Sequence, residues 1–312
     1  MPLLSRKRLI LAKTESTYGT DPTPTGSANA ILVRNLEITP LQADTVTRDL
    51  IRPYLGNSAQ LLAQTRVEVT FEVELAGSGT AGTAPAYGPV LKACGLSETV
   101  VATTSVTYAP VSASFSSVTI YFHNDGIRHK VTGCRGTFEL NAEVGQIPVI
   151  SFTMTGIYNA PTDTAAPSVT YADQASPLVF KAGNSGGFNL LAYSGCLQSV
   201  AMDIGNSIIY RELVGCTKEV LLTDRSVSGT ATIEAPTIAD KDYFTASLTD
   251  ASLGDLSFIH GTTAGNIVSL VSNRVDIGAP SYSDQDGIHM LALPYTAVPS
   301  TAGNDEIRLI YA

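Results

Sequence analysis

The sequence contains no tryptophan, few charged residues and no long apolar run. Tryptophan and tyrosine platforms usually hold sugars, so the missing tryptophan argues against a carbohydrate-processing enzyme. Charged residues make up 15% and the formal net charge is −9, and such an acidic surface repels phosphates and does not favour nucleic-acid binding. No stretch approaches the ~20 apolar residues of a membrane helix. The apolar run Leu9–Ala12 is too short for a signal peptide, so we expect a soluble protein that folds in a cytoplasm.

Motifs of enzymes and metal sites are also missing. There is no G-x-S-x-G, H-E-x-x-H or Walker sequence, and none of the four cysteines lies in a C-x-x-C pair. His123 and His129 flank a turn and could face each other, but a metal site needs a third ligand. The segment Gly77–Gly82 fits G-x-G-x-x-G, yet the strand before it alternates with charges, unlike the continuously apolar first strand of a dinucleotide-binding fold. We predict a flexible loop there, and no catalytic residue, cofactor or metal anywhere.

What the sequence does contain is an alternation of apolar and polar residues typical of half-buried β-strands. It predicts strands over Arg66–Leu75, Gly136–Val144 and Val149–Tyr158. A hairpin is predicted from Val118 to Val131, because Asp125-Gly126 supplies the positive φ that a tight turn requires. Short helices are expected over Pro85–Leu96 and Asp240–Leu248, the second with Asp240 as N-cap. The predicted class is all-β with one or two short helices.

The order of predicted elements recurs after a Pro-, Ala- and Thr-rich stretch at Asn159–Pro177. Each half has a strand, a charged Arg-Asp/Glu-Leu tripeptide, a loop, a second strand and a short helix. The strands are Asn35–Pro40 and Val67–Leu75 in one half, and Ser199–Ile204 and Val227–Ala235 in the other. We therefore predict two tandem β domains, residues 1–160 and 179–312, joined by a linker at 161–178.

The first hundred residues resemble the tail tube proteins of long-tailed bacteriophages. The segments that carry the resemblance are Ala12–Pro24, Ile31–Leu36, Arg48–Pro53, Phe71–Gly79 and Ala86–Leu96. The resemblance implies β-sandwich or small-barrel domains whose sheets join those of neighbouring subunits into a closed ring. It further implies a structural virion protein, assembled in the host cytoplasm, whose stacked rings form a hollow tube that DNA crosses without specific binding. A duplicated chain would form a trimer with pseudo-six-fold symmetry, and single units a hexamer; other tail proteins would meet the tube ends.

Two sets of residues follow as candidate sites. Carboxylates on the wet strand faces are expected to line the lumen: Glu68, Glu72, Glu74, Glu139, Glu143 and Glu234. The long loop Leu41–Gln64 is expected to reach the adjacent ring, because an exposed loop with this apolar content usually finds a partner. Its apolar residues are Leu50, Ile51, Tyr54, Leu55, Leu61 and Leu62.

Other interpretations of the same sequence remain. A baseplate ring or a contractile-tail-type tube would share the fold. An adhesion or carbohydrate-binding β-sandwich would be a monomer with an exposed aromatic patch. A hydrolase, such as a paired-carboxylate glycosidase, would need side chains that converge from distant parts of the chain.

Overall fold

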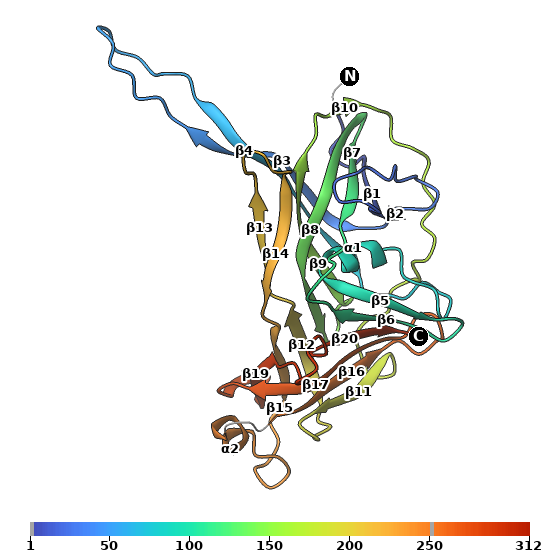
Figure 1. The fold of residues 1–312 in the computed structure, drawn as a ribbon. Helices are drawn as coiled ribbons and strands as arrows, with labels where there is room; N and C mark the ends of the chain where they lie inside the picture. Colours follow the sequence, from blue (N-terminus) through green and yellow to red (C-terminus); the bar gives the residue numbers. More distant parts are fainter. Residues whose placement is uncertain (1–2, 250–252) are drawn as a thin grey trace.

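The computed structural model describes residues 3–249 and 253–312, which form a β-rich molecule with two short helices (Figure 1). The N-terminal half contains β1 (Arg8–Thr14), β2 (Ala30–Ile31), β3 (Arg34–Val46), β4 (Leu61–Glu74), α1 (Gly88–Ala93), β5 (Leu96–Val101), β6 (Ser105–Pro110), β7 (Val118–Asn124), β8 (Ile127–Glu143), β9 (Val149–Tyr158) and β10 (Thr162–Asp163). The C-terminal half contains β11 (Ser185–Leu190), β12 (Leu197–Asp203), β13 (Asn206–Arg211), β14 (Glu219–Arg225), β15 (Ser228–Glu234), α2 (Tyr243–Leu248), β16 (Gly254–His260), β17 (Val268–Ile277), β18 (Ser281–Gln285), β19 (Ile288–Ala297) and β20 (Arg308–Tyr311). Neither helix is long or apolar enough to cross a membrane within these described ranges.

The alternating segments form the predicted strands. Every second side chain is buried on β9, on β4 from Val67 and on β8 from Gly136, and the register sets Phe71 beside Phe152 and Phe152 beside Phe138. The ring centroids of these neighbours lie 5.3 and 5.8 Å apart, within the range of favourable aromatic contact. Some bounds differ: β4 begins at Leu61, five residues before the predicted start, and the strand predicted over Gly136–Val144 is the second half of β8. Val144 lies just beyond β8 and is exposed, because the chain turns there toward β9.

The predicted hairpin forms with a two-residue turn between β7 and β8. Asn124 pairs with Ile127, and the two residues between them, Asp125 and Gly126, have φ values of 41° and 104°. Positive φ at both central positions matches the right-handed twist of the flanking strands. The local sequence therefore sets this register.

Both helices are shorter than predicted. Helix α1 covers only Gly88–Ala93, since Gly95 takes a φ of 80° and ends it before β5. Helix α2 begins at Tyr243, and its N-cap is Asp242, which accepts a hydrogen bond from the Thr245 N–H at 2.9 Å. The predicted N-cap, Asp240, is wrong: it lies three residues before Tyr243, and its carboxylate accepts instead from the Thr237 hydroxyl.

The two halves pair their strands in the same order. In the N-terminal half the order is β1-β7-β8-β9-β4-β3. In the C-terminal half it is β11-β16-β17-β19-β15-β12. The edge of β19 that faces away from β15 has two partners: β17 pairs with the last residues of β19, and β18 pairs with the first ones.

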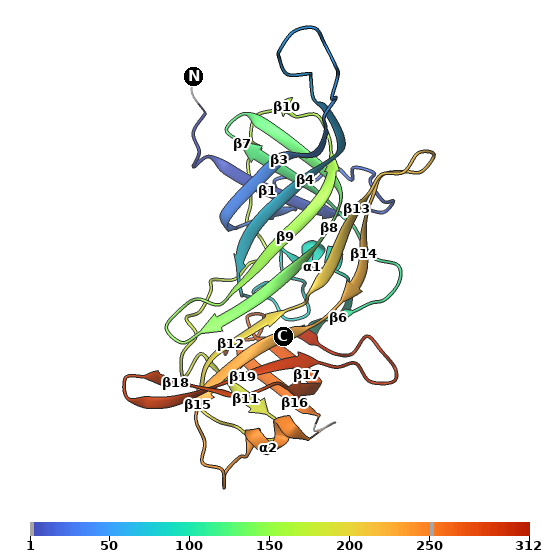
Figure 2. The same ribbon diagram turned by 90° about the vertical axis from the view of Figure 1, so that its left-hand side faces the viewer.

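A direct ladder joins the halves. Strand β12 runs antiparallel to the second half of β8, from Ser199 opposite Glu143 to Asp203 opposite Glu139. Strand β20, near the C-terminus, pairs with β6. Figure 2 shows the resulting continuity, with β4, β9, β8, β12 and β15 following one another across the molecule.

Candidate assembly surfaces

The distal part of the β3–β4 hairpin stands clear of the molecule (Figure 1). Beyond Val46 and before Leu61 the chain has no regular structure, and its apolar side chains are exposed. Ile51 and Leu55 are as accessible as in an extended peptide, at 103% and 102%. The others named from the sequence, Leu50, Tyr54, Leu61 and Leu62, are also exposed. We call residues 44–63 the arm.

Strand register brings the predicted carboxylates to one surface. Apolar side chains of β4, β8 and β15 are buried on one face of the sheet, and the glutamates alternate with them on the other. A single row across the strands runs from Glu72 through Ser151 and Glu139 to Asp203. Glu143 starts a second row through Ser199. We call this surface the carboxylate face; it holds Glu68, Glu72, Glu74, Glu139, Glu143 and Glu234, of which the last three are exposed.

Sequence reasoning missed Asp203, which occupies the same face. Its position follows only from the β8–β12 ladder, which no local pattern predicts. The face is not free of positive charge, because Arg34 lies 3.4 Å from Glu72, and Asn35 donates a further hydrogen bond to Glu72 at 2.9 Å. Both contacts are partly exposed, and such ion pairs contribute little to stability.

A second hairpin, β13–β14, follows β12 and lies against the N-terminal half (Figure 2). Its anchor is Arg135, a buried residue of β8 that donates to the Val220 carbonyl at 2.7 Å and to the Phe115 carbonyl at 3.1 Å. The guanidinium lies 4.7 Å from the ring centroid of Tyr18. The Tyr18 hydroxyl accepts from the Val220 N–H at 2.6 Å and donates to the Gly133 carbonyl, and burial raises the pKa of Tyr18 to about 12.

Further polar contacts fasten the same hairpin at its base. Asn206 donates to the Cys94 carbonyl at 2.7 Å, just after helix α1. Arg225 lies with Nε and Nη2 both 2.5 Å from one carboxylate oxygen of Glu306, and its Nη1 donates to the Val111 carbonyl at 2.9 Å. All of these groups are buried or nearly so, and a buried ion pair with satisfied donors resists being broken. In contrast to the arm, β13–β14 is thus held by its own chain.

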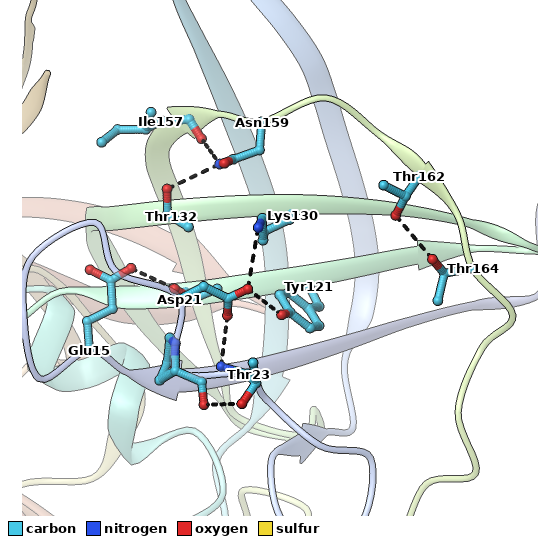
Figure 3. Close-up of polar contacts among 12 residues, drawn as sticks. Glu15, Asp21, Thr23, Tyr121, Lys130, Thr132, Ile157, Asn159, Thr162 and Thr164 are labelled. Carbon is cyan, nitrogen blue, oxygen red and sulfur yellow. Dashed lines mark hydrogen bonds and ion pairs between the residues drawn. The ribbon is translucent and has the colours of Figure 1, made fainter.

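Figure 3 shows two carboxylates that hold the segment after β1. Glu15 is buried and forms no ion pair within the described part of the chain. Its oxygens accept from the Gly19 and Gly133 N–H groups, each at 2.7 Å, and from the Ser117 and Thr119 hydroxyls, each at 2.6 Å. Four donors compensate the desolvation of the charge.

Asp21 is held differently. It accepts from the Tyr121 hydroxyl at 2.6 Å and the Thr23 N–H at 2.8 Å, and Lys130 lies 3.5 Å away (Figure 3). Partial burial alone would raise the pKa of Asp21, but these donors and the Lys130 charge together hold it below its usual value. Burial and the neighbouring carboxylate raise the pKa of Tyr121 to about 12. Both carboxylates therefore have a role in holding the fold.

The two histidines do not face each other. Phe122 pairs with His129 and His123 with Arg128, so the imidazoles lie on opposite faces of the hairpin. Burial lowers the pKa of both histidines, and the Arg128 charge lowers that of His123 further. Among residues 3–249 and 253–312 no group of three metal-ligating side chains comes together.

The glycine-rich loop is held by the C-terminal half. The Gly77 N–H donates to the Asn266 side chain at 2.9 Å, and the Gly79 N–H to the Gly265 carbonyl at 2.8 Å. A Cβ on Gly77 would lie 2.1 Å from the Gly265 oxygen, so a side chain there has no room. These glycines allow two loops of one chain to approach, and the predicted flexible loop is a packed contact. Cys94 and Cys134 are buried, whereas Cys196 and Cys216 are exposed thiols.

The described chain combines an exposed apolar arm, an open carboxylate face and a strand ladder that joins two halves with the same strand order. A model of the family described as phage tail tube protein matches residues 5–297. The chain belongs to the phage tail tube protein family. A search of curated proteins found no match. The family is one of structural proteins, so this chain is a structural component of a phage tail and of the virion, and the resemblance noted in the sequence is confirmed.

Proposed function

We propose that the chain assembles head to tail into closed rings, and that stacked rings form the tail tube through which the phage genome passes. The family membership supports the tube, and the repeated strand order supports a chain that fills two positions of each ring. Three chains then complete a ring with pseudo-six-fold symmetry. Assembly takes place in the host cytoplasm, where no bilayer has to be crossed.

The arm is the observation that carries this proposal. A monomer that left Ile51 and Leu55 fully in water would expose apolar surface with no compensating contact. Covering an apolar side chain contributes roughly 25 cal/mol per Å² of surface removed from water. The arm is therefore a contact to another subunit, and we place its tip on the adjacent ring.

The carboxylate face is proposed as the wall of the lumen. DNA carries one negative charge per ~1.7 Å of its axis, and each lysine or arginine that met a phosphate would add salt-dependent affinity. A wall of glutamates adds none, so DNA slides without binding. The opposite face of the sheet is filled by buried apolar residues and has no such exposure.

Negative-stain electron microscopy of the purified chain over a range of concentrations tests this function, together with native mass spectrometry. Rings or hollow tubes built from three chains per ring are the expected result. Rings of six chains would refute the duplicated arrangement while keeping the tube. A monodisperse monomer at every concentration would refute self-assembly altogether.

A further inference from the structure

The strand pairing that joins the two halves of one chain indicates how strands of two chains pair. The strand orders described above make β3 equivalent to β12, β4 to β15 and β9 to β19. Register extends the equivalence to single residues. The chain leaves β4 and β15 in the same way, because the Leu75 N–H donates to the Pro148 carbonyl at 2.8 Å and the Ala235 N–H donates to the His289 carbonyl at 3.0 Å. Leu75 therefore corresponds to Ala235, and Val69 to Gly229. Val69 pairs with Ile38 and Met154 on its two sides, and Gly229 pairs with Met202 and Tyr295.

The same register makes β18 equivalent to the second half of β8. In the N-terminal half, Phe71 and Val73 of β4 pair with Phe152 and Ile150 of β9, and Ile150 pairs on its other side with Leu140 of β8. In the C-terminal half, Ile233 of β15 pairs with Leu291 of β19.

Leu291 in turn pairs on its other side with Tyr282 of β18. Leu140 and Tyr282 therefore correspond, and so do residues 139–143 and 281–285.

Two strands lack a neighbour that their counterparts in the other half have. Residues 139–143 of β8 carry β12 on their outer edge, whereas β18 pairs only with β19 in the described part of the chain. Likewise β12 pairs with both β15 and β8, whereas β3 pairs only with β4 among the described residues. All five residues of β18 are exposed, as are most of β3. Strands β3 and β18 thus each present an open edge, and each is the counterpart of a strand that is paired on both sides inside the chain.

We propose that β3 of one chain pairs antiparallel with β18 of the next copy, in the register of the β12–β8 ladder. Ala201 lies opposite Asn141 and Met202 opposite Leu140 within the chain. Between chains, Glu37 then lies opposite Ser283, and Ile38 opposite Tyr282. This inference rests on the proposed ring and specifies its contact.

Side-chain chemistry supports that register. Met202 and Leu140 are buried against each other's strands on the core side, and Ile38 and Tyr282 form an apolar pair at the equivalent place. Tyr282 is 59% exposed in the single chain and is covered by the partner strand. At the far end, the proposed register brings Arg34, the first residue of β3, close to Asp284 of β18 and to Asp286 in the turn after it, so that opposite charges meet.

The two edges differ from each other, so the contact is heterologous and closes by rotation into a ring. Closure removes both open edges, which would otherwise pair with any exposed strand. The ring sheet would then continue β3-β4-β9-β8-β12-β15-β19-β18 from each chain into the next. The carboxylate face would run unbroken around it.

Engineered disulfides test this register. Directly opposed residues on antiparallel strands have Cα atoms ~4.5–5.5 Å apart, which a disulfide spans, whereas diagonal neighbours lie ~7–8 Å apart. The background carries Cys196→Ser and Cys216→Ser, because those two thiols are exposed. The test pair adds Glu37→Cys and Ser283→Cys to this background. The pair shifted by two residues adds Glu37→Cys and Gln285→Cys to the same background. Ala201→Cys with Asn141→Cys is the matched control within one chain.

After mild oxidation of assembled protein, denaturing gels without reductant should show dimers and closed trimers for the test pair. The shifted pair should stay mostly monomeric, and the control pair should close within the monomer. Rings or tubes that form without this cross-link, or that cross-link better with the shifted pair, would overturn the inference and leave the proposed function intact. Failure of the background protein to assemble at all would overturn both.

Discussion

At the scale of single residues, polar side chains with partners far away in the sequence hold the N-terminal segment in place. Glu15 and Asp21 lie in the stretch that resembles tail tube proteins, and neither has a place in the period-two pattern. Their partners lie on β7 and β8, about a hundred residues away in sequence. Sequence alone therefore could not assign them a role, whereas the structure makes them the anchors of a loop.

Glu15→Gln should destabilise the chain by about 2 kcal/mol, since an amide NH₂ cannot accept from donors that a carboxylate satisfies, and hydrogen bonds to charged groups contribute ~1.5–3 kcal/mol. Urea denaturation of unassembled protein measures the change. The same substitution at exposed Glu139 is the control and should stay within ~0.5 kcal/mol. Equal effects at the two positions would show that the buried contacts contribute nothing.

His123 should make stability depend on pH. It is 2% exposed, and burial first and the Arg128 charge second lower its pKa from its ordinary value of 6.5. Because the unfolded chain then binds a proton more readily than the folded one, stability is complete above pH 6.5 and is lost as the pH falls toward the lowered value. The free energy of unfolding should therefore fall between pH 7 and pH 5.

The His123→Gln variant should show a smaller fall over the same interval. His289→Gln is the control at an exposed position and should leave the slope as in the natural chain. An unchanged slope in the His123 variant would mean that the imidazole is not desolvated in the folded state. Asp21, whose lowered pKa contributes stability that is lost only in more acidic solution, contributes little to this window.

At the scale of elements, the sequence predicts the strands and turns that residues close together in the sequence determine. Alternation predicts β4, β8 and β9, and Asp125-Gly126 predicts the β7–β8 turn. The helix starts are missed by three residues. Before α2, Asp240 and Asp242 are equally good caps by residue type, and the sequence pattern does not choose between them. The β8–β12 ladder and the packing of Gly77 on Gly265 join distant segments, and no local pattern encodes such pairings.

The two hairpins make an informative contrast at this scale. The β13–β14 hairpin has Arg135, Tyr18 and Asn206 to hold it. Residues 45–63 of the arm make no side-chain hydrogen bond or ion pair with residues 3–249 and 253–312, and the tip carries exposed apolar residues. A hairpin that its own chain does not hold in place gains stabilising contacts only from another chain. The sequence identified the arm from its apolar content but gave no sign that β13–β14 would be docked.

Replacing residues 48–60 by a short Gly-Ser turn should leave the fold and the rings but abolish stacking. The deleted stretch makes no ladder contact with the rest of the chain, so the midpoint of urea unfolding should hardly change. Electron microscopy should show single rings in place of tubes. A milder pair, Ile51→Ser with Leu55→Ser, should weaken stacking in the same direction. Tubes of normal length would refute the stacking role, and loss of rings would place the arm within the ring.

At the scale of the whole molecule, charge and shape act together. The chain has a formal net charge of −9, and the strand register collects six glutamates and Asp203 on one continuous face. If three chains close a ring, that face forms a continuous acidic wall. Electrostatic repulsion between subunits opposes closure, and the strand pairing proposed above offsets it.

Reversing charges on this face should turn a non-binding channel into a DNA-binding one. Glu139→Lys, Glu143→Lys and Glu234→Lys together change the formal net charge from −9 to −3, because each replacement adds two. Tubes should still form, since all three side chains are exposed and make no hydrogen bond within the described structure. Duplex DNA should then be retained by the tubes, with an affinity that falls as salt rises by a slope of about 0.9 per phosphate neutralised.

The control has the same charge change outside the carboxylate face: Asp163→Lys, Asp224→Lys and Asp240→Lys, all at exposed positions. If the face lines the lumen, phage carrying the first variant should deliver DNA more slowly, and phage carrying the control should deliver it normally. Net charge alone would slow both variants equally. Delivery that is normal in both would place the carboxylate face away from the DNA, on the outside of the tube, where the glutamates would serve only solubility.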